Sequence, residues 1–138
     1  MTVRRGTLAS SDSSFQFAIW NTPFQAVSVD LLDVTYSAQS GDLYFRIWVE
    51  DSKSTYKVIF ENVSAFRVLD EHGLLELWTM TKRLSGRPAQ TTFRVRNNSW
   101  CKESPLTFQI TDGWSFVVAT DSDCIEIVAA KEPAITLE

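Results

Sequence analysis

Residues 56–69 read Tyr-Lys-Val-Ile-Phe-Glu-Asn-Val-Ser-Ala-Phe-Arg-Val-Leu, with an apolar side chain at almost every second position. The alternation includes positions 56, 58, 60, 66 and 68, and only Asn62 and Ser64 interrupt it. A period of two is typical of a β-strand with one buried face. The stretch therefore predicts one long strand with a bend or bulge near its middle.

Similar alternation occurs on both sides of this stretch. Residues 43–49, 114–118 and 125–129 each place apolar side chains at every second position. Polar turns at 51–54 and 120–123 join neighbouring segments and predict two antiparallel hairpins. Further extended segments are expected at 15–19, 27–36, 91–95 and after Pro133, a short helix or edge strand at 74–78, and a loop at 97–104 followed by a short segment at 106–110. The predicted fold class is α+β, mainly β, with a single antiparallel curved sheet and at most one or two short helices.

The length and composition indicate one domain. Of the 138 residues, 44% are hydrophobic and 22% are charged, which suffices for a core without disulfides. Residues 1–14 are polar and serine-rich, and we expect them to form a flexible N-terminal lead-in. Residues 15–138 are expected to form a single globular domain.

The charge is unevenly distributed along the chain. The net charge is -4, so broad nucleic-acid binding is not expected. Residues 79–102 nevertheless contain six basic side chains and no acid, which leaves -10 for the remainder. This basic segment either steers a polyanion or an acidic protein, or is a solvated loop and strand flank.

The cysteines and the apolar segments allow an expectation about the cellular compartment of the protein. The first 14 residues lack the apolar region of a signal peptide, and no stretch approaches the ~20 apolar residues of a membrane helix. We therefore expect a cytoplasmic protein without membrane contact, in which thiols are reduced. Cys101 and Cys124 either pair or stay free, and Cys124 is expected to be packed rather than reactive.

Residues with catalytic potential are sparse in this sequence. His72 is the only histidine, and no Gly-x-Ser-x-Gly motif presents a serine to it. The two cysteines lack the Cys-x-x-Cys spacing of zinc and thiol sites. We therefore predict no catalytic residue, no metal ligand and no cofactor, although a pair of carboxylates brought together by the fold stays open.

The five tryptophans are candidates for the core or for a contact surface. Trp48 and Trp114 are expected to belong to a core on both faces of the sheet, whereas Trp100 has polar neighbours and is either exposed or packed. Trp and Arg are enriched in protein interfaces, and loops carry function on rigid scaffolds. The candidate partner-binding residues are Arg83, Arg87 and Trp100.

Two segments carry a resemblance to known proteins: residues 58–68 followed by Asp70-Glu71, and residues 116–128 closed by Glu132-Pro133-Ala134-Ile135. Both segments resemble small bacterial immunity proteins of toxin systems and their uncharacterised relatives. The resemblance implies a compact domain that binds and neutralises a cognate toxin. It transfers no catalytic residue to this chain.

The sequence therefore predicts a non-enzymatic protein-binding domain, and the resemblance implies that this domain is a toxin-neutralising immunity protein. The net acidity suits a basic partner, although residues 79–102 would repel such a partner locally. One alternative is a small-ligand binding module or an enzyme on a β-rich scaffold. Another is a structural homo-oligomer, such as a homodimer, that pairs edge strands or buries tryptophans.

Overall fold

The computed structural model describes residues 14–70, 91–120 and 122–138. Within these ranges lie nine strands, one α-helix and one short 3-10 helix. In chain order they are β2 (Gln16–Ile19), β3 (Val29–Ser37), β4 (Asp42–Val49), β5 (Ser54–Phe60), β6 (Ala65–Asp70), β7 (Thr92–Arg96), α3 (Ser99–Glu103), η3 (Gln109–Thr111), β8 (Trp114–Ala119), β9 (Asp123–Val128) and β10 (Ala134–Leu137). No helix among them is long and apolar enough to span a membrane. The predicted segment at 74–78 lies outside the described residues.

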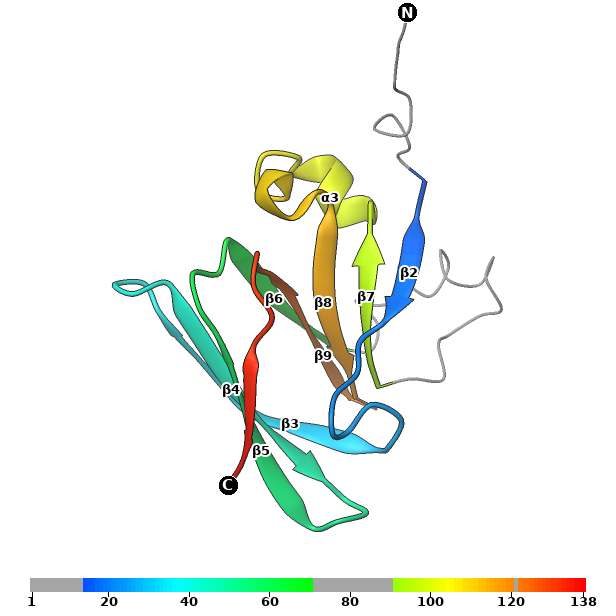
Figure 1. The fold of residues 1–138 in the computed structure, drawn as a ribbon, viewed down its shortest axis with the longest axis vertical. Helices are drawn as coiled ribbons and strands as arrows, with labels where there is room; N and C mark the ends of the chain where they lie inside the picture. Colours follow the sequence, from blue (N-terminus) through cyan, green and yellow to red (C-terminus); the bar gives the residue numbers. More distant parts are fainter. Residues whose placement is uncertain (1–13, 71–90, 121) are drawn as a thin grey trace, which may run out of the picture.

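The strands form two antiparallel sheets that pack against each other (Figure 1). The four-stranded sheet has the order β10-β5-β4-β3, and the five-stranded sheet has the order β2-β7-β8-β9-β6. Two predicted hairpins, β4–β5 and β8–β9, are present. The prediction of a mainly β, antiparallel fold with a short helix is therefore confirmed, but the strands form two sheets and not the single sheet expected.

The second sheet arises where one long strand was predicted. Residues 56–69 belong to β5 in one sheet and to β6 in the other, because the chain crosses between the sheets at residues 61–64. Asn62 adopts the left-handed conformation, with φ at 51°, and ends the first strand. The amide of Val63 then donates to Gly41 beside β4, whereas the next amide, of Ser64, donates to Val128 of β9. Val58 and Phe60 before the crossing and Phe66 after it pack in the same core, which is why the alternation looked continuous.

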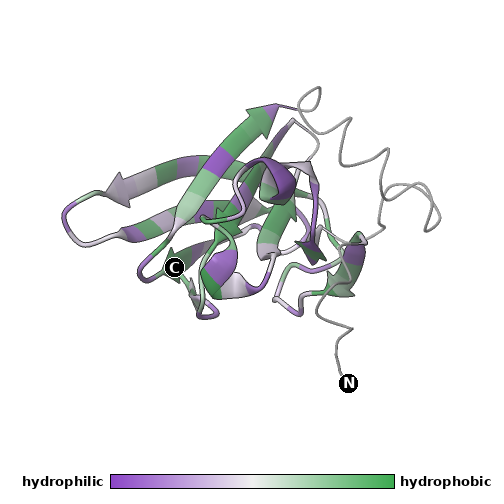
Figure 2. Cartoon of the chain, turned by 90° about the horizontal axis from the view of Figure 1, so that it is seen from above, coloured by the Kyte–Doolittle hydropathy of each residue, from purple (hydrophilic) through white to green (hydrophobic). Residues whose placement is uncertain are grey.

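The main core lies between the two sheets. Leu43, Phe45 and Ile47 of β4 are completely buried in it, and Phe116 and Ile127 reach it from the five-stranded sheet. The hydropathy pattern along the strands shows this alternation directly (Figure 2). Because apolar burial contributes roughly 25 cal/mol per Å2, these interleaved side chains supply much of the stabilisation of the fold.

The five-stranded sheet also buries side chains on its other face. Phe93, Val95, Val117 and Cys124 form a second apolar cluster there, with Phe17 packed against it. Strands β8 and β9 therefore contain apolar residues at consecutive positions, which is typical of a sheet covered on both faces. The expectation that Cys124 is packed is confirmed, and both cysteines carry free thiols.

The outer face of the four-stranded sheet is polar. Arg46 of β4 is paired with Asp33 of β3, and this guanidinium holds the pKa of the Asp33 carboxyl below its usual range. The ammonium of Lys57 lies 4.3 Å from the ring centroid of Tyr44. Trp48 is half-buried on this face and donates from its indole nitrogen to Glu50 at 2.9 Å. Trp48 is therefore a surface side chain on this face, contrary to the expectation of a core residue.

Candidate functional site

Of the three residues that the sequence predicts for partner binding, the structure describes Trp100. Arg83 and Arg87 lie outside the described residues, as does His72. Trp100 is half-buried on α3. Its ring meets that of Phe108 edge-on, with 5.2 Å between the ring centroids. Part of the indole surface is therefore used inside the molecule, and Trp100 serves as a packing residue as well as a candidate contact.

A buried carboxylate lies next to this helix, on the outer face of the five-stranded sheet. Glu126 of β9 is only 1% exposed. Arg67, opposite it on β6, donates from Nε to Oε1 at 2.9 Å and places Nη2 2.7 Å from the same oxygen. The second oxygen, Oε2, accepts from Asn98 Nδ2 at 2.8 Å and from Ser115 Oγ at 2.6 Å. These four residues form the Glu126 cluster, in which both carboxylate oxygens have partners, as a buried charge requires.

The Glu126 cluster attaches α3 to three strands. Asn98 is the N-cap of the helix, and its Oδ1 accepts from the backbone nitrogen of Cys101 at 3.0 Å. The same side chain therefore caps the helix and binds the buried acid. The guanidinium of Arg67 lies over the ring of Trp100, 4.5 Å from its centroid, in a cation–π contact. As a result β6, β8 and β9 all hold the helix in one position.

Residues 97–113 connect β7 to β8, and we call them the 97–113 loop (Figure 1). Its backbone closes on itself through short-range hydrogen bonds, including one from the Gly113 amide to the Phe108 carbonyl at 3.1 Å. Phe108 is buried beneath the loop. Arg96 of β7 donates from Nε to the Asp112 carbonyl at 2.8 Å and pairs with the Asp112 carboxylate at 2.7 Å. The loop is thus held by hydrogen bonds, by the contacts of Arg96 with Asp112 and by the burial of Phe108.

This loop presents two large aliphatic side chains to solvent. Leu106 is 83% exposed and Ile110 is 67% exposed. The sequence predicts a loop at 97–104, but that segment contains α3, and residues 105–108 form turns that lead into η3. Because this segment is coiled and packed only through Phe108, its other apolar side chains project outward.

A second feature lies on the inner face of the same sheet, where β7 and β8 pair. Arg94 is opposite Phe116, and Arg96 is opposite Trp114. The guanidinium carbon of Arg94 lies 4.6 Å from the ring centroid of Phe116 and 5.1 Å from that of Trp114. That of Arg96 lies 6.0 Å from the Trp114 ring centroid. Trp114 is therefore half-buried between two arginines rather than in an apolar core.

The described residues offer little nucleophilic or metal chemistry. Burial raises the pKa of the Cys101 thiol, so this group stays protonated at neutral pH. The hydroxyl of Ser115 donates to a buried carboxylate, an arrangement that holds the acid rather than activates the serine. Within residues 14–70, 91–120 and 122–138, no three side chains of His, Cys, Asp or Glu converge on a metal position.

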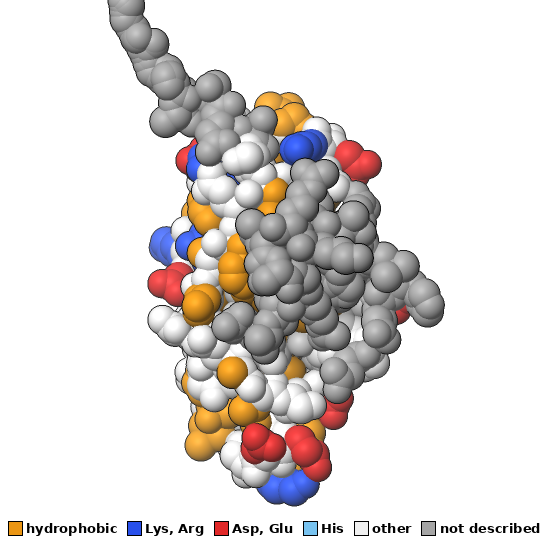
Figure 3. Space-filling view, turned by 90° about the vertical axis from the view of Figure 1, so that its right-hand side faces the viewer, with side chains coloured by type: hydrophobic (Ala, Val, Ile, Leu, Met, Phe, Trp, Pro, Cys, Tyr) orange, Lys and Arg blue, Asp and Glu red, His pale blue; other side chains and the backbone are white. Residues whose placement is uncertain are grey.

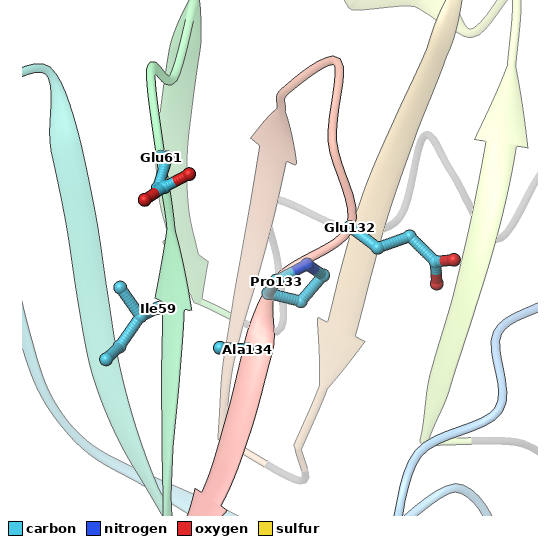
Figure 4. Close-up of a pocket in the computed structure, with 5 residues that line it drawn as sticks. All are labelled: Ile59, Glu61, Glu132, Pro133 and Ala134. Atoms are coloured by element: carbon cyan, nitrogen blue, oxygen red, sulfur yellow. The ribbon is translucent and has the colours of Figure 1, made fainter.

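The structure also contains an open depression of about 420 Å3 beside β10. Ile59, Glu61, Glu132, Pro133 and Ala134 line it. Its two carboxylates come from different segments, and the side chain of Glu132 extends away from Glu61 (Figure 4). General acid–base catalysis needs both groups directed at one reacting bond, so this depression does not provide the carboxylate pair that the sequence left open.

Sequence reasoning did not identify Glu126, Asn98 or Arg94 as site residues. A signal for the first was present, because Glu126 is the one charged side chain between Cys124 and Val128, where both faces of the strand are apolar. An acid in such a stretch requires buried donors. The donors themselves come from distant parts of the chain, and only the fold brings them to the carboxylate.

No protein-family model matches this chain, and comparisons with curated proteins and with solved structures found no match.

Proposed function

We propose that the chain is a non-enzymatic protein-binding domain that contacts its partner through the 97–113 loop. The observation that carries this proposal is the exposure of Leu106 and Ile110, at 83% and 67%, on a segment whose backbone is held in place. Single exposed aliphatic residues are common on protein surfaces. Two of them on one braced loop form a small apolar projection of the kind that fills a pocket on a partner.

The bracing supports binding because it lowers the entropy lost when the complex forms. A loop that is ordered before binding loses less conformational freedom than one that orders on contact. The Glu126 cluster, the Asn98 cap and the Arg96–Asp112 pair all restrict the 97–113 loop without using Leu106 or Ile110. The described structure thus separates the residues that hold the loop from those that would contact the partner.

Toxin neutralisation is the particular function that the resemblance to bacterial immunity proteins implies, and it is part of this proposal. An immunity protein acts by occupying its toxin, so a rigid contact surface is sufficient for the task. The acidic net charge of -4 would assist encounter with a basic toxin.

The experiment has two steps. The tagged chain first captures proteins from a lysate of its source organism, and any partner in stoichiometric amount is identified and purified. Calorimetry then compares the parent chain with the double variant L106S/I110S. We expect the double variant to bind the partner at least about tenfold more weakly, because both apolar anchors are lost. If the partner is a toxin, the parent chain protects growing cells against it and the double variant protects them less.

Leu137→Ser is the matched control, because Leu137 is 63% exposed but lies on β10. We expect this variant to bind as the parent does. Equal binding by all three chains would contradict the proposal, and so would an enzyme activity of the parent chain that one substitution abolishes. Sedimentation of the pure protein tests a second copy as the partner. A dimer that the double variant breaks would overturn the proposal in favour of the homo-oligomer.

A further inference from the structure

Arg94 differs from the other arginines that the structure describes. Arg46, Arg67 and Arg96 each donate from Nε to an oxygen, at distances of 2.9, 2.9 and 2.8 Å. Each of them also places Nη2 against a carboxylate. The Nε atom of Arg94 is buried, and within the described part of the chain it has no hydrogen-bond partner. Arg94 is therefore a cation whose buried Nε has no acceptor among the described residues.

Arg94 lies on β7, next to the edge strand β2 of the five-stranded sheet, and the residue is only partly buried although its Nε atom is buried. It lies on the inner face of the five-stranded sheet between Ala18 of β2 and Phe116 of β8. Strands β7 and β2 are on the side of this sheet away from β4 and β5 (Figure 1). On the side of β2 the neighbouring side chain is a small methyl group. Figure 3 views the molecule from this side, where the visible Lys and Arg side chains lie near Asp and Glu side chains as well as hydrophobic ones.

The guanidinium of Arg94 is surrounded by one negatively charged side chain and two aromatic rings. Burial lowers the pKa of the Arg94 guanidinium, and the charge of Glu132 opposes this effect. No ion pair joins these two side chains in the described structure. The rings of Phe116 and Trp114 lie against the guanidinium face. They fix its plane and leave its edge as the part that an acceptor can meet.

We propose that Arg94 is a binding site for a carboxylate group, held by the edge of a guanidinium that lies on Phe116 and Trp114. A small turn of the side chain presents Nε and one Nη to the two oxygens of the ligand, in the side-on geometry that Arg46 uses with Asp33. The nearby charge of Glu132 favours a ligand with one negative charge over a doubly charged phosphate. This site does not depend on the protein partner proposed above.

Nuclear magnetic resonance of the Nε–H groups tests the site directly. The isolated protein is titrated with sodium acetate, and sodium chloride at equal ionic strength serves as the reference. We expect the Arg94 Nε–H resonance to shift and saturate with acetate, whereas the Arg46 resonance, already bound to Asp33, stays in place. Arg94→Met should raise the apparent Kd for acetate at least about tenfold, and the variant should remain folded because an unpaired buried charge has been replaced by an apolar side chain.

Two further arms of the experiment establish the chemistry and the source of the ligand. Inorganic phosphate that binds more tightly than acetate would overturn the carboxylate assignment. Equal shifts at Arg94 and Arg46, or a shift without saturation, would overturn the site altogether. N-acetyl-glutamate amide carries the carboxylate of a protein side chain. Binding at least as tight as that of acetate assigns the site to a peptide-borne acid, and weaker binding assigns it to a free small carboxylate.

Discussion

The carboxylate of Glu126 is the residue on which the order of the 97–113 loop depends most directly. Four atoms of three residues contact this carboxylate. Each of the three residues also makes a second contact or belongs to an element that borders the loop. Arg67 stacks on Trp100, Asn98 caps α3, and Ser115 belongs to the strand that follows the loop. Removing one donor leaves a buried charge less well solvated, which costs more than the hydrogen bond itself contributed.

Ser115→Ala tests this dependence with a small change of volume. We expect the variant to lose about 1–3 kcal/mol in the free energy of unfolding, because Oε2 of Glu126 loses a donor that water does not replace. Equilibrium unfolding in urea measures the difference. Ser28→Ala is the control, since Ser28 is exposed, and its effect should stay within about 0.5 kcal/mol. Equal losses in the two variants would contradict the role of Glu126.

The same residues explain which parts of the site could be predicted from the sequence. Trp100 was selected because it stands among polar neighbours, and it does lie on the loop proposed here for contact. Arg94 and Glu126 appeared as ordinary members of alternating strands. Their environment depends on which residues face them across β6, β8 and β9, and a single sequence does not contain that information.

The 97–113 loop also depends on backbone conformations that few residues adopt. Gly113 has φ at 90°, and a Cβ atom there would lie 2.6 Å from the Asn97 side-chain oxygen. Gly41 has φ at 79°, but a Cβ atom at that position would lie 3.6 Å from its nearest neighbour. The two glycines therefore share the conformational requirement and differ in the space available.

This pair gives a matched prediction for the loop. Alanine at either position forces a left-handed conformation and costs roughly 1–2 kcal/mol. Gly113→Ala also pushes against Asn97, so we expect it to lower the Tm by several degrees more than Gly41→Ala does. Differential scanning calorimetry of the two variants measures this. If Gly41→Ala proved the more damaging change, the close packing of residues 97 and 113 would be wrong.

At the level of elements, the strands were more predictable than the helix or the sheets. Alternation along β4 identifies that strand because one of its faces is buried, whereas β8 and β9 are identified by apolar residues on both sides of the polar turn at 120–123. The five residues of α3 are too few to show a helical period, and Asn98 as N-cap was their only signal. The number of sheets was missed because alternation specifies a buried face but not the sheet to which that face belongs.

The molecule as a whole protects its two thiols to different degrees. Cys124 is fully buried between β8 and β6, whereas Cys101 is half-buried on α3. A buried thiol in a central strand becomes accessible only when the sheet opens, and that requires an opening free energy close to that of global unfolding.

Thiol labelling therefore reports the stability of the whole fold. In the variant Cys101→Ser, we expect Cys124 to react with a disulfide reagent at least about a thousandfold more slowly in buffer than in concentrated urea. The parent protein should show one additional, faster phase from Cys101, slowed by the burial that raises its pKa. Absorbance of the released thiolate follows both phases. Labelling of Cys124 at the same rate with and without urea would contradict the burial of this thiol in the folded five-stranded sheet.

The two sets of charged pairs should also respond differently to dissolved electrolyte. Arg46–Asp33 and Lys53–Glu50 lie at the surface, where counterions approach within a few ångströms once the Debye length falls to about 3 Å in molar salt. Ions of the solution do not reach Glu126, so its attraction to Arg67 is not screened in the same way. High ionic strength would therefore weaken the ion pairs at the surface of the four-stranded sheet more than the attraction between Arg67 and Glu126, which helps to hold α3.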